Sequence, residues 1–425
     1  MRYESKTWKT ESNFLNLTVS DFLWLLAMNM LLFQSAIQNA TGFTLIDELA
    51  TAALVIAALL KASRGSLKLR GGLLAGVFIC VATLVLIGLA SNYASGVTDN
   101  LKPILADVFA CIKFPIALIS ANLVFKDAAL LRTVFEGETR ALILVLFVLA
   151  VLNLFVPIAD FGNDPRYGLR ASFQFVFGHP EGVNFVVVGL LTVLLLDRKR
   201  NLVWILLGTI VMCLTLRSKA FVYVAVVWFL TATWGKKGKL KKYHVMLGVL
   251  AAIAIGYDQF VYYYNSEGFA RSELTRVGFL IANEYFPLGS GFATYGSNIT
   301  ASTAYYSPLY YKYGLSTVDG LIPGSVSFLS DVFWPIVIGQ FGWIGLVIYI
   351  LMIALLFIFL YKGSSHSGQR LACLACLLFL LVSSTAESAF FHPCAIYLAI
   401  CLGLALSSNK ADGSEAVTAD GIEIA

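Results

Sequence analysis

Nine of the 30 lysine and arginine residues stand apart from the short basic clusters of this chain. They are Lys102, Lys113, Arg166, Arg170, Arg217, Lys219, Arg271, Arg276 and Lys312. The planar guanidinium group of arginine matches phosphate oxygens with two hydrogen bonds, and a lysine ammonium adds a point charge. The pattern indicates an anion-binding site, with a phosphate or diphosphate as its ligand. Each arginine could instead pair with a nearby acid, namely Asp160, Asp164, Glu273 or Glu284.

Seven of these cations are the candidate contacts to the anion. They are Arg166, Arg170, Arg217, Lys219, Arg271, Arg276 and Lys113. Arg217 and Lys219 lie in "TLRSKAF", where the start of a helix would also direct backbone amides at a phosphate. Lys113 lies inside an apolar stretch, where a charge is costly and marks either function or an ion pair with an acid on another helix.

Three further side chains are candidates for accepting a proton. They are His179 in "FGHPEGVN", Asp331 in "LSDVFW" and Glu387 in "TAESAFFHP". Histidine and carboxylate side chains are the usual general bases. The alternatives are a turn hydrogen bond for His179 and a structural ion pair with an arginine for Glu387. Because no paired carboxylate motif demands a metal, we expect neither a metal nor a cofactor.

Tyrosines and glycines fill the polar stretch from 271 to 320, which includes Tyr305 and Tyr306. A tyrosine offers an apolar face with a hydroxyl at its edge, which suits the C–H faces and hydroxyls of a sugar. A belt of aromatic residues at a membrane surface is the alternative. As a group these tyrosines favour a surface that binds carbohydrate or a lipid headgroup.

The elements that must position these residues are membrane helices. Hydrophobic residues make up 59% of the 425 residues and charged residues only 13%, which excludes a water-soluble globule. Apolar stretches long enough to cross about 30 Å of hydrocarbon recur, and each must be a helix. They predict an all-α polytopic membrane protein with about twelve spans, at 20–37, 44–61, 72–90, 103–125, 141–158, 182–196, 202–216, 220–235, 244–262, 333–360, 371–385 and 389–406.

The basic clusters predict the orientation of these spans. Cytoplasmic loops retain lysine and arginine, and alternate loops with the two tails hold 21 of the 30. Both termini are therefore expected in the cytoplasm, and the net charge of +5 reflects topology rather than nucleic-acid binding. We expect spans one to nine in residues 1–262, a long external loop or lid in 263–332, spans ten to twelve in 333–408, and a disordered cytoplasmic tail in 409–425.

Three stretches carry a resemblance to a known family. They are "FVFGHPEGVNF" at 175–185, "PLGSGFATYG" at 287–296 and "SDVFWPIVIGQFGWIGLVIYI" at 330–350. With the long external loop, they resemble the O-antigen polymerase and ligase superfamily, the Wzy-type proteins and their relatives. The resemblance implies a GT-C-like helical bundle in the bacterial inner membrane. It also implies an arginine-rich periplasmic site that receives undecaprenyl-diphosphate-linked glycans as donor and acceptor.

The resemblance also implies roles for particular residues. Arg271 stands where relatives have an arginine ahead of a proline-glycine-glycine turn, here Pro287, Gly289 and Gly291. Ligases carry a histidine before the tenth span, where this chain has Ser330 and Asp331, and this difference favours a polymerase. The arginine, ten residues, glycine spacing of polymerase loops is not met by Arg166 or Arg170. A chain-length regulator is the implied protein partner, beside membrane lipids.

The implied reaction is glycosyl transfer without a metal. A sugar hydroxyl of one lipid-linked repeat unit attacks C1 of the growing chain, and the lipid diphosphate leaves. Transfer of the glycan to lipid A-core by a ligase is the first alternative. Transport of lipid-linked glycans is the second, and it is disfavoured because the sequence shows no internal repeat of the kind that secondary transporters carry.

Overall fold

A computed structural model describes residues 17–64, 71–158, 167–168, 172–233, 257, 261, 268–302 and 305–407 of the chain. These residues form a helical bundle with one short two-stranded sheet. The longer helices are α1 (Val19–Leu32), α2 (Gln34–Thr41), α3 (Ile46–Ser63), α4 (Gly71–Ser95), α5 (Leu101–Val124), α6 (Ala129–Asn153), α7 (Pro180–Leu194), α8 (Leu202–Leu214), α9 (Ser218–Thr233), α11 (Ala270–Glu284), α13 (Trp334–Gly363), α14 (Ser367–Ser383) and α15 (Cys394–Ala405).

Short elements complete the described chain. They are the 3-10 helices η2 (Phe175–Phe177), η3 (Leu195–Asp197) and η4 (Leu315–Thr317), the helix α12 (Pro308–Lys312), and the strands β1 (Ala301–Ser302) and β2 (Tyr305–Tyr306). The two strands pair antiparallel, with Ala301 opposite Tyr306.

The helices have the length and composition of a membrane protein. Among the helices of the described residues, four are long and apolar enough to cross a bilayer, at Gly72–Ser95, Leu101–Val124, Pro180–Asp197 and Trp334–Gly363. The helices α8, α9, α14 and α15 are apolar but shorter. Each predicted span except the ninth overlaps a helix, and the ninth falls outside the described residues apart from Tyr257 and Val261. The all-α membrane class is therefore confirmed, whereas the number of twelve spans stays a prediction.

The first predicted span, 20–37, differs from a single helix. The chain bends by 71° at Phe33, between α1 and α2. The residues after the bend include the polar side chains Gln34, Gln38 and Asn39, for which hydrocarbon offers no hydrogen-bond partner. Hydropathy averaged over the stretch does not reveal the bend, because the two helices together are still apolar enough to span a membrane.

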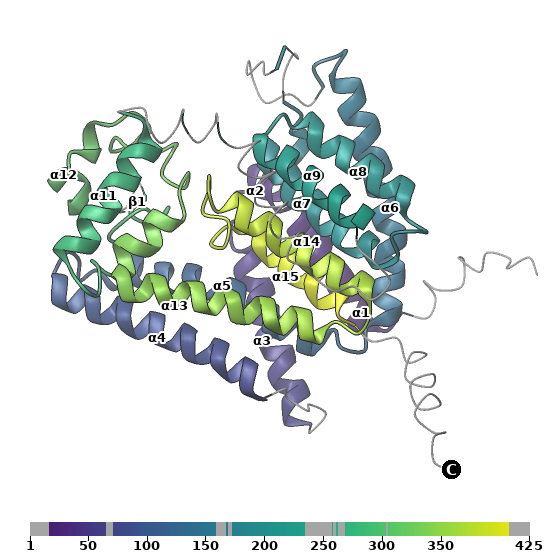
Figure 1. Ribbon diagram of the computed structural model, residues 1–425, viewed down its shortest axis with the longest axis horizontal. Helices are drawn as coiled ribbons and strands as arrows, with labels where there is room; N and C mark the ends of the chain where they lie inside the picture. The colour runs from purple at the N-terminus through teal and green to yellow at the C-terminus, as the bar shows by residue number, and fades with distance from the viewer. Residues whose placement is uncertain are drawn as a thin grey trace, which may run out of the picture.

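Two helices form the centre of the bundle. Every residue of α7 and of α15 is buried. The helix α15 packs against α5 and α7, while α14 packs against α7 and α9. Beside this centre, α13 packs against α4 and α11 (Figure 1). The helices α11 and α12 and the strand β1 gather at one end of the molecule, toward which the turn between α14 and α15 also points (Figure 1). We call this the loop end.

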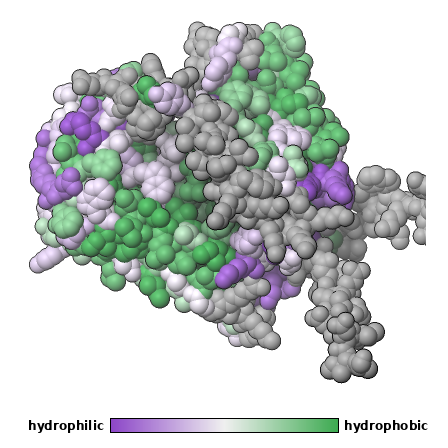
Figure 2. All heavy atoms as spheres, in the orientation of Figure 1, coloured by the Kyte–Doolittle hydropathy of each residue, from purple (hydrophilic) through white to green (hydrophobic). Residues whose placement is uncertain are grey.

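The surface reflects the same arrangement. In Figure 2 hydrophobic side chains spread over α4 and α13, and hydrophilic ones gather over α11 and α12 at the loop end. Leu86, Val347 and Leu351 are among the exposed apolar residues of α4 and α13. Because a large contiguous apolar surface is costly in water, this face suits contact with lipid.

The "PLGSGFATYG" turn is fixed to the bundle by hydrogen bonds. The Asp107 carboxylate on α5 accepts from Ala293 N (2.7 Å) and from Gln340 Nε2 on α13 (2.8 Å). On α4, Asn92 donates to Phe292 O (2.8 Å) and accepts from Phe292 N (2.8 Å). Side chains from three helices therefore satisfy the polar backbone of the turn, as a buried loop requires.

The glycines of this turn serve packing within the chain. Gly289 and Gly342 both have positive φ, 78° and 63°. A Cβ on Gly289 would lie 2.4 Å from Gly342 N, and one on Gly342 would lie 2.4 Å from Pro287 O. The glycines let the turn approach α13 closely, at the point where the helical geometry of α13 is interrupted at Gly342.

Candidate functional site

Lys219 is shared between two carboxylates at the loop end. Its Nζ lies 3.0 Å from Glu181 Oε2 and 2.7 Å from Glu387 Oε1. The three side chains are between 10% and 12% exposed. They come from the starts of α7 and α9 and from the turn between α14 and α15. Two acids around one base, nearly out of solvent, form a polar site that the tertiary fold assembles from distant parts of the sequence.

Local backbone structure explains the position of Glu181. The His179 side chain caps α7 by accepting a hydrogen bond through Nδ1 from Glu181 N (3.2 Å), and Pro180 occupies the first turn. An acid in the first turn of a helix is stabilised by the helix dipole. Asn184, one turn later, donates to Glu181 Oε2 (3.3 Å) and accepts from the hydroxyl of Thr215 (3.2 Å).

The turn between α8 and α9 brings Lys219 to the same place. Leu216 adopts φ 53°, the left-handed region that a branched apolar side chain rarely enters. Arg217 follows it, and Arg217 O accepts from Ala220 N (2.9 Å) as α9 begins. This turn directs Lys219 toward α7, and such backbone strain is typical of functional sites.

A second ion pair lies close to the first group. Arg271 Nη2 on α11 is 2.9 Å from Asp331 Oδ2, in the segment before α13. The backbone joins the two groups, because Ser388 N donates to Ser330 O (2.8 Å). We call Glu181, Lys219, Glu387, Arg271 and Asp331 the charged cluster.

Burial changes the protonation of the two loop carboxyls in the charged cluster. It raises the pKa of Glu387 to about 7, opposed by Lys219 and reinforced by Glu181. It also raises the pKa of Asp331, opposed first by Arg271 and then by Lys219, while Glu181 acts in the same direction as burial. Because Lys219 and Glu181 influence Asp331, the two ion-paired groups lie within electrostatic reach of each other.

His392 packs against α7, the helix that carries Glu181 of the cluster. Its ring stacks on Phe185 of α7 with centroids 4.7 Å apart, and its Nδ1 accepts from Cys394 N (3.1 Å).

Four of the predicted site residues meet in the charged cluster, and two lie beside it. Arg271, Asp331, Lys219 and Glu387 are members, His179 caps the helix that carries Glu181, and Arg217 directly precedes α9. The hydrogen bond of His179 fits the alternative role in a turn rather than the role of proton acceptor. Arg166 and Arg170 lie outside the described residues.

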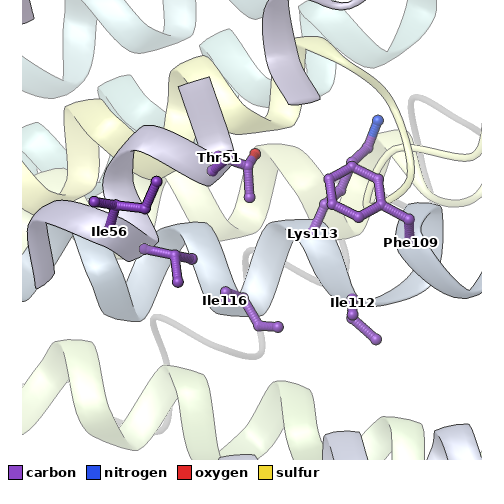
Figure 3. Close-up of a pocket in the computed structure, with 8 residues that line it drawn as sticks. Thr51, Ile56, Phe109, Ile112, Lys113 and Ile116 are labelled. Carbon is purple, nitrogen blue, oxygen red and sulfur yellow. The ribbon is translucent and has the colours of Figure 1, made fainter. Parts of the chain in front are cut away.

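The remaining predicted site residues lie in other surroundings. Arg276 pairs with Glu273 (2.7 Å) and is 57% exposed. Lys113 pairs with Asp47 of α3 (2.7 Å), and both side chains are at most 5% exposed. Lys113 stands at the side of an otherwise largely apolar groove of about 250 Å³ between α3 and α5 (Figure 3). The geometry of both cations therefore fits an ion pair with an acid of the chain rather than a contact to a bound anion.

The tyrosines divide between interior and surface. Tyr295 and Tyr310 are fully buried, and Tyr310 OH accepts from Gly296 N (2.8 Å). Tyr305 and Tyr306 are half-buried, and Tyr306 OH donates to Leu321 O (2.7 Å). Tyr311 is 61% exposed. The expected open tyrosine surface is therefore smaller than the sequence indicates, because several rings form the interior of the loop.

Glu181 and His392 were not among the predicted site residues. Glu181 lies within the quoted "FGHPEGVN", and an acid directly before an apolar run is a signal that could have identified it. The nearness of His392 to the cluster depends on tertiary packing, and the sequence carries no signal for it.

Comparison with known proteins adds no relative, because no family model, no curated protein and no solved structure matches the chain.

Proposed function

We propose that the chain is a glycosyltransferase that polymerises undecaprenyl-diphosphate-linked oligosaccharide repeat units into O-antigen or a related surface polysaccharide. The observation that carries the proposal is the charged cluster, where Arg271 and Lys219 are each held by carboxylates from other elements at one end of an apolar bundle. In such a site the cations can bind a diphosphate, and a carboxylate can accept a proton. The resemblance in the sequence supplies the class of substrate.

The proposed setting is the bacterial inner membrane. The bundle would cross it with about twelve spans and both termini in the cytoplasm, so that the loop end faces the periplasm. The apolar helices support a membrane location, and the distribution of lysine and arginine supports this orientation. Undecaprenyl-linked repeat units would then reach the charged cluster from the outer leaflet.

The proposed reaction forms one glycosidic bond and breaks one bond to phosphate. An acceptor hydroxyl attacks C1 of the growing chain, the bond from C1 to the diphosphate oxygen breaks, and the hydroxyl proton passes to a carboxylate. The lipid diphosphate is a stable leaving group. The protein therefore has to position two substrates, neutralise the developing charge and accept one proton.

Glu387 is the proton acceptor that we propose. Its pKa of about 7 lies near the working pH, where a general base is most effective. Lys219, in contact with Glu387 Oε1, stabilises the ionised form of the carboxyl. His179 uses Nδ1 to cap α7, and Asp331 is paired with Arg271. Arg271 is the proposed contact to the diphosphate, with Arg217 as a second cation.

Reconstitution tests this proposal. The purified protein is incubated with one defined undecaprenyl-diphosphate-linked repeat unit and no other enzyme, and the products are separated by length. We expect a ladder of polymers from the unchanged protein and only single units from Arg271→Ala. Lys312→Ala is the matched control, because it removes another cation of the same loop, paired with Glu284 on the surface.

The outcomes separate the proposed activities. Polymer of normal length from Arg271→Ala would remove this arginine from the site. Absence of polymer from the unchanged protein, with transfer of single units to lipid A-core when that acceptor is added, would identify a ligase. Movement of the lipid-linked unit across a vesicle membrane without any new glycosidic bond would identify a transporter.

A further inference from the structure

The pair between Arg271 and Asp331 joins an α11 cation to an acid from the segment before α13. Their atoms lie 2.9 Å apart, with side chains 20% and 29% exposed. Asp331 is thus reachable from solvent, unlike Asp47 in its pair with Lys113, where the two side chains are 3% and 5% exposed. A partly accessible ion pair can be opened by a competing anion, whereas a buried one is held by the cost of leaving its charges unpaired.

The surroundings of Asp331 are nearly balanced in charge. Arg271 faces it from α11, Lys219 from α9 and Glu181 from α7. Glu387 is held near Asp331 because the N–H of the next residue, Ser388, donates to the carbonyl of Ser330. An anion that approaches Arg271 therefore meets the Asp331 carboxylate at the same guanidinium group, and the two negative charges cannot both be accommodated at low cost.

We propose that Asp331 occupies Arg271 in place of the substrate, and that the diphosphate of the lipid carrier displaces it and leaves Asp331 to take up one proton. This inference rests on the proposed function, because it takes the diphosphate as the ligand of Arg271. It assigns Asp331 the role of an internal counter-ion rather than that of the catalytic base. Release of the product diphosphate would restore the pair and return the proton to solvent.

The protonation step follows from the environment of Asp331. Burial already raises its pKa, and Arg271 is the main influence in the opposite direction. When the guanidinium group turns to a diphosphate, that influence is lost and a second anion lies nearby. Both changes raise the pKa further, so an ionised Asp331 binds a proton from solvent as the diphosphate binds.

Titration calorimetry with farnesyl diphosphate, a short carrier analogue, tests the exchange on the purified full-length protein. Repeating the titration in buffers of different ionisation enthalpy measures the protons taken up. We expect proton uptake by the unchanged protein. Asp331→Asn should abolish that uptake and tighten binding about tenfold, because no internal anion competes. Glu284→Gln, which alters the surface pair with Lys312, should change neither quantity.

Each outcome decides between roles. Binding without proton uptake, with Asp331→Asn binding equally or more weakly, would make the pair a fixed structural contact while the diphosphate site still stands. No binding of farnesyl diphosphate to either protein would overturn both the exchange and the proposed function. Should Asp331→Asn not fold, proton uptake by the unchanged protein decides, since its absence overturns the exchange.

Discussion

Glu387 shows how the charge of a residue depends on where the fold places it. A glutamate in solution is ionised well below neutral pH, but burial raises the pKa of Glu387 to about 7. Lys219 keeps the value from rising further, because it stabilises the carboxylate at 2.7 Å. A carboxyl with a pKa near neutrality is suited both to accept and to release a proton.

This placement predicts a pH dependence for glycosyl transfer. If Glu387 acts as the base, only its ionised form is active. The value of kcat should therefore be low at pH values below about 7 and rise as the pH passes through about 7. Glu387→Gln should lower kcat by about 10²- to 10⁴-fold and remove that inflection. The measurement is polymer formation by the purified protein between pH 5.5 and 8.5. An unchanged inflection in Glu387→Gln would assign it to another group.

Individual charged residues could be selected from sequence because the chain has few charges outside its basic clusters. Lys219 and Glu387 stand next to apolar runs, whereas Arg271 and Asp331 were selected by their place in the long loop and by the resemblance. Their partners could not, since Lys219 meets Glu387 across 168 positions of sequence only through the packing of α9 and α14. The same limit explains why an ion pair of Lys113 with an acid on another helix could be considered, but its partner Asp47 could not be named until the fold placed α3 beside α5.

At the scale of elements, α13 and the "PLGSGFATYG" turn form one unit. Ser290 N and Gly291 N donate to Gly339 O and Gln340 O, both at 2.9 Å. Gly342 then leaves helical geometry with φ 63°. Hydropathy averaged along the sequence predicts the long helix at this position. It predicts neither the interruption at Gly342 nor the helix α11 inside the polar loop. Both depend on backbone contacts between segments.

A substitution at Gly342 tests whether this unit is required for folding. Gly342→Ala forces a side chain into the left-handed region, which costs about 1–3 kcal/mol, and sets its Cβ 2.4 Å from Pro287 O. We expect a lower melting temperature and less monodisperse protein after detergent extraction. Gly137→Ala in α6 is the control, because nothing lies within 4 Å of its Cβ. Equal stability of the two variants would contradict the role of the turn.

At the scale of the whole molecule, the charged cluster and the long loop share one end of the bundle. Lys61 and Arg200 belong to the basic residues that predict a cytoplasmic face, and neither lies in the elements that form the loop end. The sequence predicts the side of the membrane for each end through charge alone. The proposed enzyme depends on this orientation, because the repeat units to be joined must reach the loop end from outside the cytoplasm.

Single cysteines can report this orientation directly. Thr317 in the loop and Ser63 at the end of α3 are both exposed, and each can be replaced by Cys in a Cys213→Ala background. The other six native cysteines are buried, so labelling of them should be low. In intact spheroplasts, a membrane-impermeant maleimide should label Thr317→Cys and leave Ser63→Cys unlabelled until the membrane is permeabilised. The reverse pattern would place Arg271 and the rest of the charged cluster in the cytoplasm, where an enzyme that joins exported repeat units cannot act.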